Sequence, residues 1–162
     1  PPNLDAMEWF IGEVFAGIRA QLPQVRLHCI GAAAPDSLLA LAANQPGVEM
    51  HGFVEDIVPY MEGARIAIAP LRFGAGVKGK INLSMAHGQP VIGTTCAVEG
   101  MHLQPGQDVL VADDAATFAA EVVRLYQDPQ LWHQLSDAGL ANVAQHFSLH
   151  AARATVQRVF FD

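Results

Sequence analysis

Charged side chains are scarce in this 162-residue chain. They make up 15% of it, with 16 Asp and Glu against nine Lys and Arg, which gives a net charge of −7. An acidic balance of this kind argues against nucleic acid as a partner. The sequence also lacks any run of about 18 apolar residues, the length that a membrane-spanning helix requires, so we expect no membrane span.

Cysteine is nearly absent, and the residue types that bind metals are dispersed. Cys29 and Cys96 each lie in or beside an expected strand without the spacing of metal ligands, the seven His are scattered, and no Asp-x-Asp occurs. We therefore expect two buried, reduced thiols in a cytoplasmic protein, no metal site and no metal cofactor. No signal peptide is recognised, and residues 1–3 are expected to follow a first strand that the sequence does not include.

Apolar residues, in contrast, make up 51% of the chain. Short apolar runs alternate with helical patterns, which predicts parallel strands joined by right-handed helical crossovers. The expected class is α/β, a Rossmann-like, three-layer, doubly wound parallel sheet followed by C-terminal helices, in one domain that spans residues 1–162. The expected strands are 25–30, 48–50, 65–69, 91–94 and 109–112, and the helices after the sheet include 129–146 and 149–160.

The segment 65–101 predicts a strand, a glycine loop, a helix over 77–86 and a second strand. Gly74 and Gly76 allow a ligand to approach the main chain, and unpaired N–H groups at a helix start suit a phosphate. From 63 to 98 the sequence contains no Asp or Glu but includes two Arg and both Lys of the protein. These features predict an anion site built from Arg72, Gly74, Ala75, Gly76, Val77 and Lys78. A buried strand-helix-strand unit with solvated cations on its rim is the alternative.

Other candidate residues lie near this loop or follow other expected strands, at the sheet edge where parallel sheets bind ligands. Lys78 and Asn82 are four apart and share a helix face, whereas Lys80 lies on another face and is expected to be solvated. Gly31 begins a loop that forms either a wall of the site or a plain turn. Glu99 and Gly100 follow the strand 91–94, and Glu99 either holds a hydroxyl group or is an exposed loop acid.

The motifs PLRFGAGVKGK, SMAHGQPVIGT and AVEGM, and more weakly PPNLDAMEWF, HGFVED and DVLVADD, resemble the donor-binding half of the group 1, type-B glycosyltransferases. The resemblance implies that residues 1–162 are a single C-terminal domain, and that an N-terminal acceptor-binding domain lies outside the sequence. Its partners would be a nucleotide-sugar donor and that N-terminal domain, through which the enzyme could associate peripherally with a membrane. The implied activity is transfer of a hexosyl group to an acceptor hydroxyl with retention of configuration, without a metal, in the synthesis of bacterial surface polysaccharides or glycoconjugates. The domain alone would be inactive.

The resemblance also assigns positions and exposes departures. Phe53 and Val54 would lie beside the nucleobase, although Phe53 could equally pack in the core. The family's two glutamates fall on Ala75 and Leu83, so recognition of the sugar would depend on Lys78, Asn82 or Glu99. The last helix would cross to the N-terminal domain, which would leave an apolar patch at Val159, Phe160 and Phe161.

Four other functions remain open at this stage. Residues 74–80 fit G-x-x-x-x-G-K, the phosphate loop of an ATPase, but Ile81 replaces the Ser or Thr that binds Mg²⁺. A dinucleotide-binding dehydrogenase domain would need an early G-x-G-x-x-G, which is absent. A sugar-nucleotide epimerase of the same architecture, and a non-catalytic interaction domain on a degenerate transferase fold, both fit the pattern.

Overall fold

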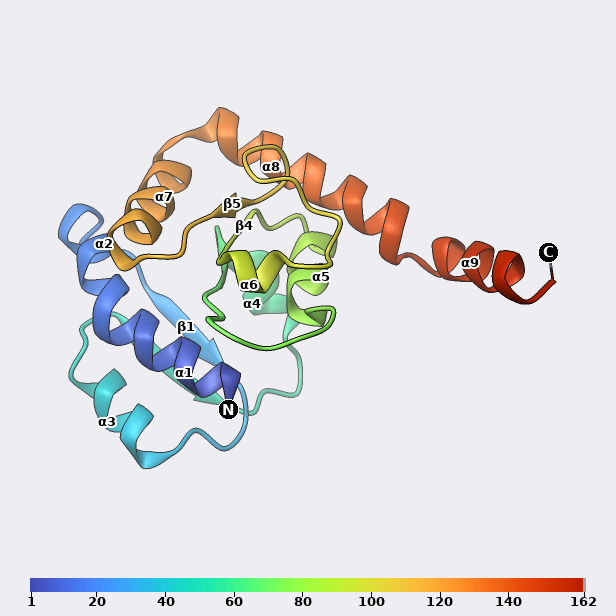
Figure 1. The fold of residues 1–162 in the computed structure, drawn as a ribbon. Helices are drawn as coiled ribbons and strands as arrows, with labels where there is room; N and C mark the ends of the chain where they lie inside the picture. The colour runs from blue at the N-terminus through green and yellow to red at the C-terminus, as the bar shows by residue number, and fades with distance from the viewer. Residues whose placement is uncertain (162) are drawn as a thin grey trace.

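The computed structural model describes residues 1–161, without the side chains of 154, 155, 160 and 161. All strand pairs in this part are parallel, which confirms the α/β class with helical crossovers (Figure 1). The strands fall within or close to the expected ranges; they are β1 (Leu27–Ile30), β2 (Val48–Gly52), β3 (Ala67–Ala69), β4 (Val91–Gly93) and β5 (Leu110–Val111).

The strands form two separate ladders rather than one continuous sheet. β1 pairs with β2, and β4 lies between β3 and β5. Within the described residues no ladder joins β1 to β3. The edges of these two strands therefore border the break in the sheet.

The helices cover both faces of the strands and continue beyond them. They are α1 (Pro2–Trp9), the π-helical turn η1 (Phe10–Val14), α2 (Phe15–Gln21), α3 (Asp36–Ala43), α4 (Val58–Gly63), α5 (Gly79–Ala86), α6 (Thr95–Val98), α7 (Ala115–Gln127), α8 (Pro129–Asn142), the π-helical turn η2 (Val143–Phe147) and α9 (Leu149–Phe161). Two expectations were wrong: α5 begins at Gly79 rather than 77, and the segment after β4 contains the short helix α6. The Thr94 hydroxyl caps α6 by accepting a hydrogen bond from the Ala97 N–H (3.1 Å).

Neighbouring residues of β4 point to opposite faces and bury separate clusters, as a strand in a three-layer domain must do. Ile92 packs with the aromatic side chains of α1, η1 and α7. Val91 packs with Ile81 and Met85 of α5 on the other face. A third cluster places α1 and α3 over one face of β1 and β2. The three layers therefore match the prediction.

α9 extends away from the body of the molecule (Figure 1). Its apolar residues Leu149, Val156 and Val159 are 79%, 51% and 64% exposed. The expected apolar patch is thus present at Val159, while the side chains of Phe160 and Phe161 lie outside the described residues. In the part of the chain that the structure describes, no helix has the length and apolar character to cross a membrane.

Candidate functional site

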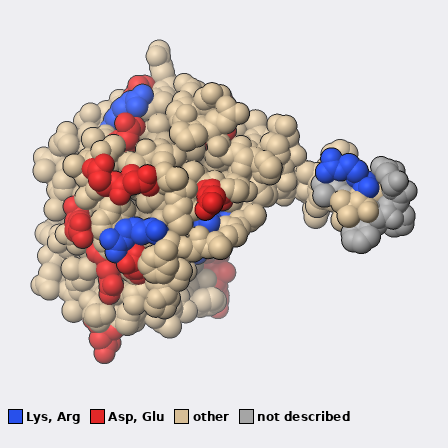
Figure 2. All heavy atoms as spheres, viewed as in Figure 1, with Lys and Arg blue, Asp and Glu red and all other residues tan. Residues whose placement is uncertain are grey.

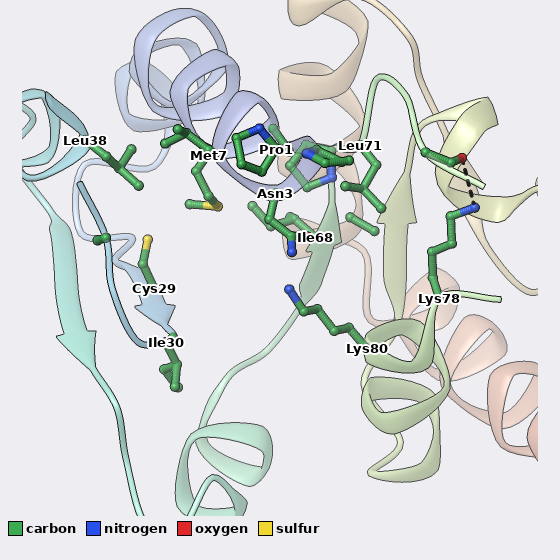
Figure 3. Close-up of a pocket in the computed structure, with 18 of the residues that line it drawn as sticks. Pro1, Asn3, Met7, Cys29, Ile30, Leu38, Ile68, Leu71, Lys78 and Lys80 are labelled. Carbon is green, nitrogen blue, oxygen red and sulfur yellow. Dashed lines mark hydrogen bonds between the residues drawn. The ribbon is translucent and has the colours of Figure 1, made fainter. Parts of the chain in front are cut away.

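A cleft of about 1000 Å³ lies at the break between the two ladders (Figure 3). Its walls come from the start of α1, from β1 and the loop after it, from β3, and from the glycine loop that leads into α5. Because all strands run in parallel, the loops after β1 and β3 meet at the same edge. The cleft therefore includes the edge at which the sequence places an anion site.

The glycine loop has the backbone geometry expected from its sequence. Gly74 and Gly76 adopt φ values of 126° and 83°, in the region that favours glycine. A Cβ atom at Gly74 would lie 3.6 Å from Pro2, so the loop runs close to the start of α1. The two glycines thus bring the loop to the mouth of the cleft.

The position of the helix start changes which amides face outward. The Lys78 N–H, expected to bind phosphate, contacts the Met101 sulfur at 3.2 Å, and Lys78 is the N-cap of α5. Helix geometry leaves the first N–H groups without an intrahelical acceptor. The amides available at this helix start are therefore those of Gly79 and Lys80, two residues later than the sequence indicates.

Both lysines line the cleft, but their side chains point in different directions. The Lys78 ammonium group turns back toward the loop and donates to the Gly74 carbonyl at 3.5 Å. Lys80 extends into the cleft and points toward Asn3 on the opposite wall (Figure 3). Lys80, expected to be merely solvated, is thus the lysine whose charge faces the cavity.

Arg72 is engaged elsewhere than expected. Its guanidinium group donates to both carboxylate oxygens of Asp5, at 2.9 and 2.5 Å, and lies 5.7 Å from the Trp9 ring. Arg72 is absent from the cleft wall. The bidentate contact assigned to a phosphate is therefore made here with a carboxylate of α1.

The Arg72–Asp5 pair should make stability depend on pH in the acid range. The hydrogen bond from Arg72 lowers the pKa of Asp5 below its ordinary value of 3.8. The pair therefore contributes fully to the stability of the fold above pH 3.8, and this contribution is lost as the pH falls through the lowered pKa of Asp5. We expect Arg72→Ala to reduce the melting temperature slightly at neutral pH, because the pair is exposed, and to reduce it less once Asp5 is protonated, when only the contact with the Trp9 ring is lost. Melting curves of both proteins across this pH range measure the difference, and an equal deficit at every pH would contradict it.

The remaining candidates divide into two groups. The cleft is lined by five of them, namely Gly31, Gly74, Ala75, Val77 and Lys78. The cleft wall does not include the other seven, which are Arg72, Gly76, Phe53, Val54, Asn82, Glu99 and Gly100. Phe53 is 76% exposed, so the alternative of core packing was wrong. Glu99 is an exposed residue at the end of α6. Asn82 is half-buried, and its side-chain oxygen has no hydrogen-bond partner among the described residues.

The charge around the glycine loop in the folded structure also differs from the charge along the sequence. The acid-free window is adjacent in space to Asp5, which no local reading of the sequence could show. Acidic side chains gather over the part of the surface formed by α1, α3 and α7, whereas the half formed by α5, α6 and α8 presents mostly uncharged residues (Figure 2). The cleft thus lies between an acidic and a nearly neutral part of the surface.

The cysteines only partly match the expectation. Cys29 is buried, and desolvation raises the pKa of its thiol to about 11, which makes it unreactive at neutral pH. Cys96 is half-buried and donates to the Gly74 carbonyl at 3.5 Å. The expectation of two buried thiols therefore holds for Cys29 alone.

The expectation that the His residues are scattered was wrong at one place. His28, Glu49 and His51 converge on the outer face of β1 and β2. No spacing rule could identify this group, because His28 is separated from the other two by a whole crossover. The only signal was the strand period, which puts Glu49 and His51 on one face.

Comparison with known proteins gives consistent matches. The family described as "Glycosyl transferases group 1" matches residues 1–128. A Bacillus subtilis (strain 168) protein named "Putative glycosyltransferase EpsD" is 26% identical over 144 residues, which cover 85% of this chain and 37% of that protein. The chain thus spans little more than a third of the length of this relative.

Solved structures share the fold at low sequence identity. S. aureus TarM, in a complex that includes UDP, has a TM-score of 0.81 at 11% identity, with 100% of this chain and 34% of that chain covered. Anabaena HepE, in complex with UDP and glucose, has a TM-score of 0.74 at 14% identity, with 91% and 44% covered. At these identities the likeness shows the fold alone.

Proposed function

Because the chain belongs to the group 1 glycosyltransferases, we propose that residues 1–162 bind the nucleotide-sugar donor of an enzyme that transfers a hexosyl group to an acceptor hydroxyl with retention of configuration. The observation that carries this proposal is the cleft at the carboxyl edge, with the start of α5 and the Lys80 side chain on its wall (Figure 3). The UDP in the structures of TarM and HepE is consistent with it. A bacterial polysaccharide or glycoconjugate is the acceptor class that we propose.

The chemistry at this edge is electrostatic. As the bond between the sugar and the diphosphate breaks, negative charge grows on the leaving diphosphate. The amides of Gly79 and Lys80 and the Lys80 ammonium group would stabilise that charge without reorganisation. These groups need no metal to do so, and we propose that donor binding is independent of Mg²⁺.

The break in the sheet supports a second part of the proposal. β1 and β3 face the cleft with unpaired edges, and the apolar side chains of Met7, Ile30 and Ile68 lie on its walls. Unpaired strand edges bordering an apolar cavity are costly unless another strand completes the hydrogen bonds. We propose that a strand preceding residue 1 enters between β1 and β3 and fills that part of the cleft, which leaves the edge at the start of α5 and Lys80 open for the donor. We propose also that an acceptor-binding N-terminal domain precedes this strand. Without that domain, residues 1–162 would bind donor but transfer nothing.

One observation supports the alternative of a non-catalytic interaction domain. Ala75 and Leu83, which occupy the positions of the family's glutamates, offer no polar group, and neither Asn82 nor Glu99 lines the cleft. The ATPase alternative loses support, since Ile81 is only 2% exposed and lies among apolar residues. An epimerase would use the same donor pocket, and analysis of the products of the longer protein would separate it from a transferase.

A thermal-shift titration tests donor binding. We expect UDP or GDP to raise the melting temperature equally in EDTA and in Mg²⁺, by an amount equivalent to about 2.7 kcal/mol when the nucleotide is present at 100 times its Kd. Uridine and guanosine, which lack the diphosphate, are the matched controls. The titration is run on residues 1–162 and on the longer protein with the preceding strand. Absence of stabilisation in both, or stabilisation only by Mg²⁺-ATP, would overturn the proposal.

A further inference from the structure

The outer face of the β1–β2 ladder carries a group of side chains to which the proposed donor site assigns no role, and of which only His28 borders the cleft. Leu27 and Cys29 of β1 and Val48 and Met50 of β2 pack toward α1 and α3. Since strand side chains alternate, His28, Glu49 and His51 point to the opposite face. Their side chains are 35%, 33% and 22% exposed, so the group is half-buried but open to solvent.

Three ligand atoms in this group face one another. His28 Nδ1 lies 2.9 Å from His51 Nε2 and 3.2 Å from Glu49 Oε2, and the distance from His51 Nε2 to Glu49 Oε2 is 3.7 Å. In a tetrahedral zinc site with bonds of about 2.0–2.1 Å, two ligand atoms are about 3.3 Å apart. The three distances bracket that value, so one ion could reach all three atoms with little movement.

Neighbouring side chains hold the three groups in this arrangement. Arg26 donates to the other carboxylate oxygen of Glu49 at 3.0 Å, which leaves Oε2 turned toward the two imidazoles. This hydrogen bond also lowers the pKa of Glu49, so the carboxylate is ionised at neutral pH. The Tyr60 ring of α4 packs against both His rings, with centroids 6.2 Å from His28 and 4.8 Å from His51. Supporting contacts of this kind orient metal ligands.

We propose that His28 Nδ1, Glu49 Oε2 and His51 Nε2 bind a divalent transition-metal ion, with Zn²⁺ as the best fit. Two imidazoles and one carboxylate suit Zn²⁺ and its first-row neighbours, whereas Mg²⁺ and Ca²⁺ prefer sites made of oxygen ligands. A water molecule would take the fourth position on the open side. When the ion binds, the imidazole that donates to the other must change tautomer, so that its proton lies on the second ring nitrogen and the facing nitrogen is free to bind the ion. The ion would link β1 to β2 near the cleft.

Co²⁺ titration of the chain, prepared without an affinity tag and treated with chelator, tests this proposal. We expect one equivalent of Co²⁺ to produce visible d–d absorption bands that Zn²⁺ abolishes and Mg²⁺ does not. Zn²⁺ should also raise the melting temperature, because it binds only the folded arrangement. No saturable binding, or binding of Mg²⁺ with equal affinity, would overturn the proposal.

Two variants locate the ion. His51→Gln should weaken Co²⁺ binding at least about tenfold, the smallest loss that removal of even a supporting contact causes. His146→Gln is the matched control, because the His146 ring stacks on His102 at 4.3 Å but no third ligand group joins that pair in the described part of the chain. Equal losses in both variants, or none in either, would contradict the assignment.

A measurement on the unaltered chain avoids any effect of substitution on folding. Bound Cu²⁺ should broaden the NMR signals of β1, β2 and Tyr60 before those of α8 and η2. Broadening that begins at His102 and His146 would place the ion elsewhere. The stabilisation by UDP or GDP should be unchanged in His51→Gln, so failure of the metal proposal and failure of donor binding are distinguishable.

Discussion

Lys80→Ala is expected to weaken the binding of UDP or GDP by about 10–100-fold, equivalent to about 1.4–2.7 kcal/mol, as for a lost charge-assisted contact. The reason is geometric: the Lys80 side chain extends into the cleft, whereas the Lys78 ammonium group donates to the Gly74 carbonyl at 3.5 Å (Figure 3). Lys78→Ala should therefore reduce affinity less than Lys80→Ala. Isothermal titration of each variant with the diphosphate and with the free nucleoside measures the difference.

The comparison of the two lysines contains its own control. They are two residues apart, carry the same charge and are the only lysines in the sequence. A general effect of net charge would therefore act equally on both variants. Lys80→Arg should retain most of the affinity, since a cation remains at the cleft. If Lys78→Ala loses more affinity than Lys80→Ala, the diphosphate binds on the loop side rather than at the start of α5.

Much of the fold follows from the sequence because the deciding signals are local. The strand-helix-strand unit from β3 to β4 is marked by apolar runs, by glycines, and by Gly88 with φ of 72° after the helix. These residues report on backbone conformation within a few positions. Helix caps such as Ser148, which accepts a hydrogen bond from the Ala151 N–H at 3.1 Å, are local in the same way.

The details of the site could not be read in this manner because they depend on contacts between distant segments. Arg72 meets Asp5 across 67 positions of sequence, and the Lys78 N–H meets Met101 across 23. Each contact removes a group that the local pattern assigned to phosphate. The period of α5 separates Lys78 from Lys80, but the tertiary packing of the helix decides which of them faces the cleft.

The first helical segment shows a further limit of prediction from the sequence. The apolar residues Met7, Ile11, Val14, Ile18 and Leu22 recur at the spacing of one continuous helix, whereas the π-helical turn η1 interrupts the helix between α1 and α2. A π turn contains one extra residue and so shifts the phase of the helix. Within this turn, Phe10 packs against the cluster around Phe118 while its neighbour Ile11 packs over β1 and β2. One regular helical repeat therefore does not describe a segment that contains a π turn and packs its side chains into two separate clusters.

Phe118→Ala is expected to lower the free energy of unfolding by about 3–5 kcal/mol, as is usual for removing a fully buried aromatic side chain. Phe118 is 0% exposed and meets Trp9 and Phe10 edge to face, with ring centroids 5.8 and 5.6 Å apart. These contacts join α7 to the helices that border the cleft. The cavity would therefore loosen the start of α1, where Pro2 and Asn3 line the site. Urea denaturation followed by circular dichroism measures the change.

Phe53→Ala is the matched control, because it removes the same atoms from a side chain that is 76% exposed. We expect its effect on the free energy of unfolding to stay within about 0.5 kcal/mol, as for surface substitutions in general. Equal losses in the two variants would mean that the cost does not arise from burial in the cluster of α1, η1 and α7. A large loss in Phe118→Ala alone, together with a weaker stabilisation by UDP or GDP, would connect the packing of α7 to the geometry of the cleft.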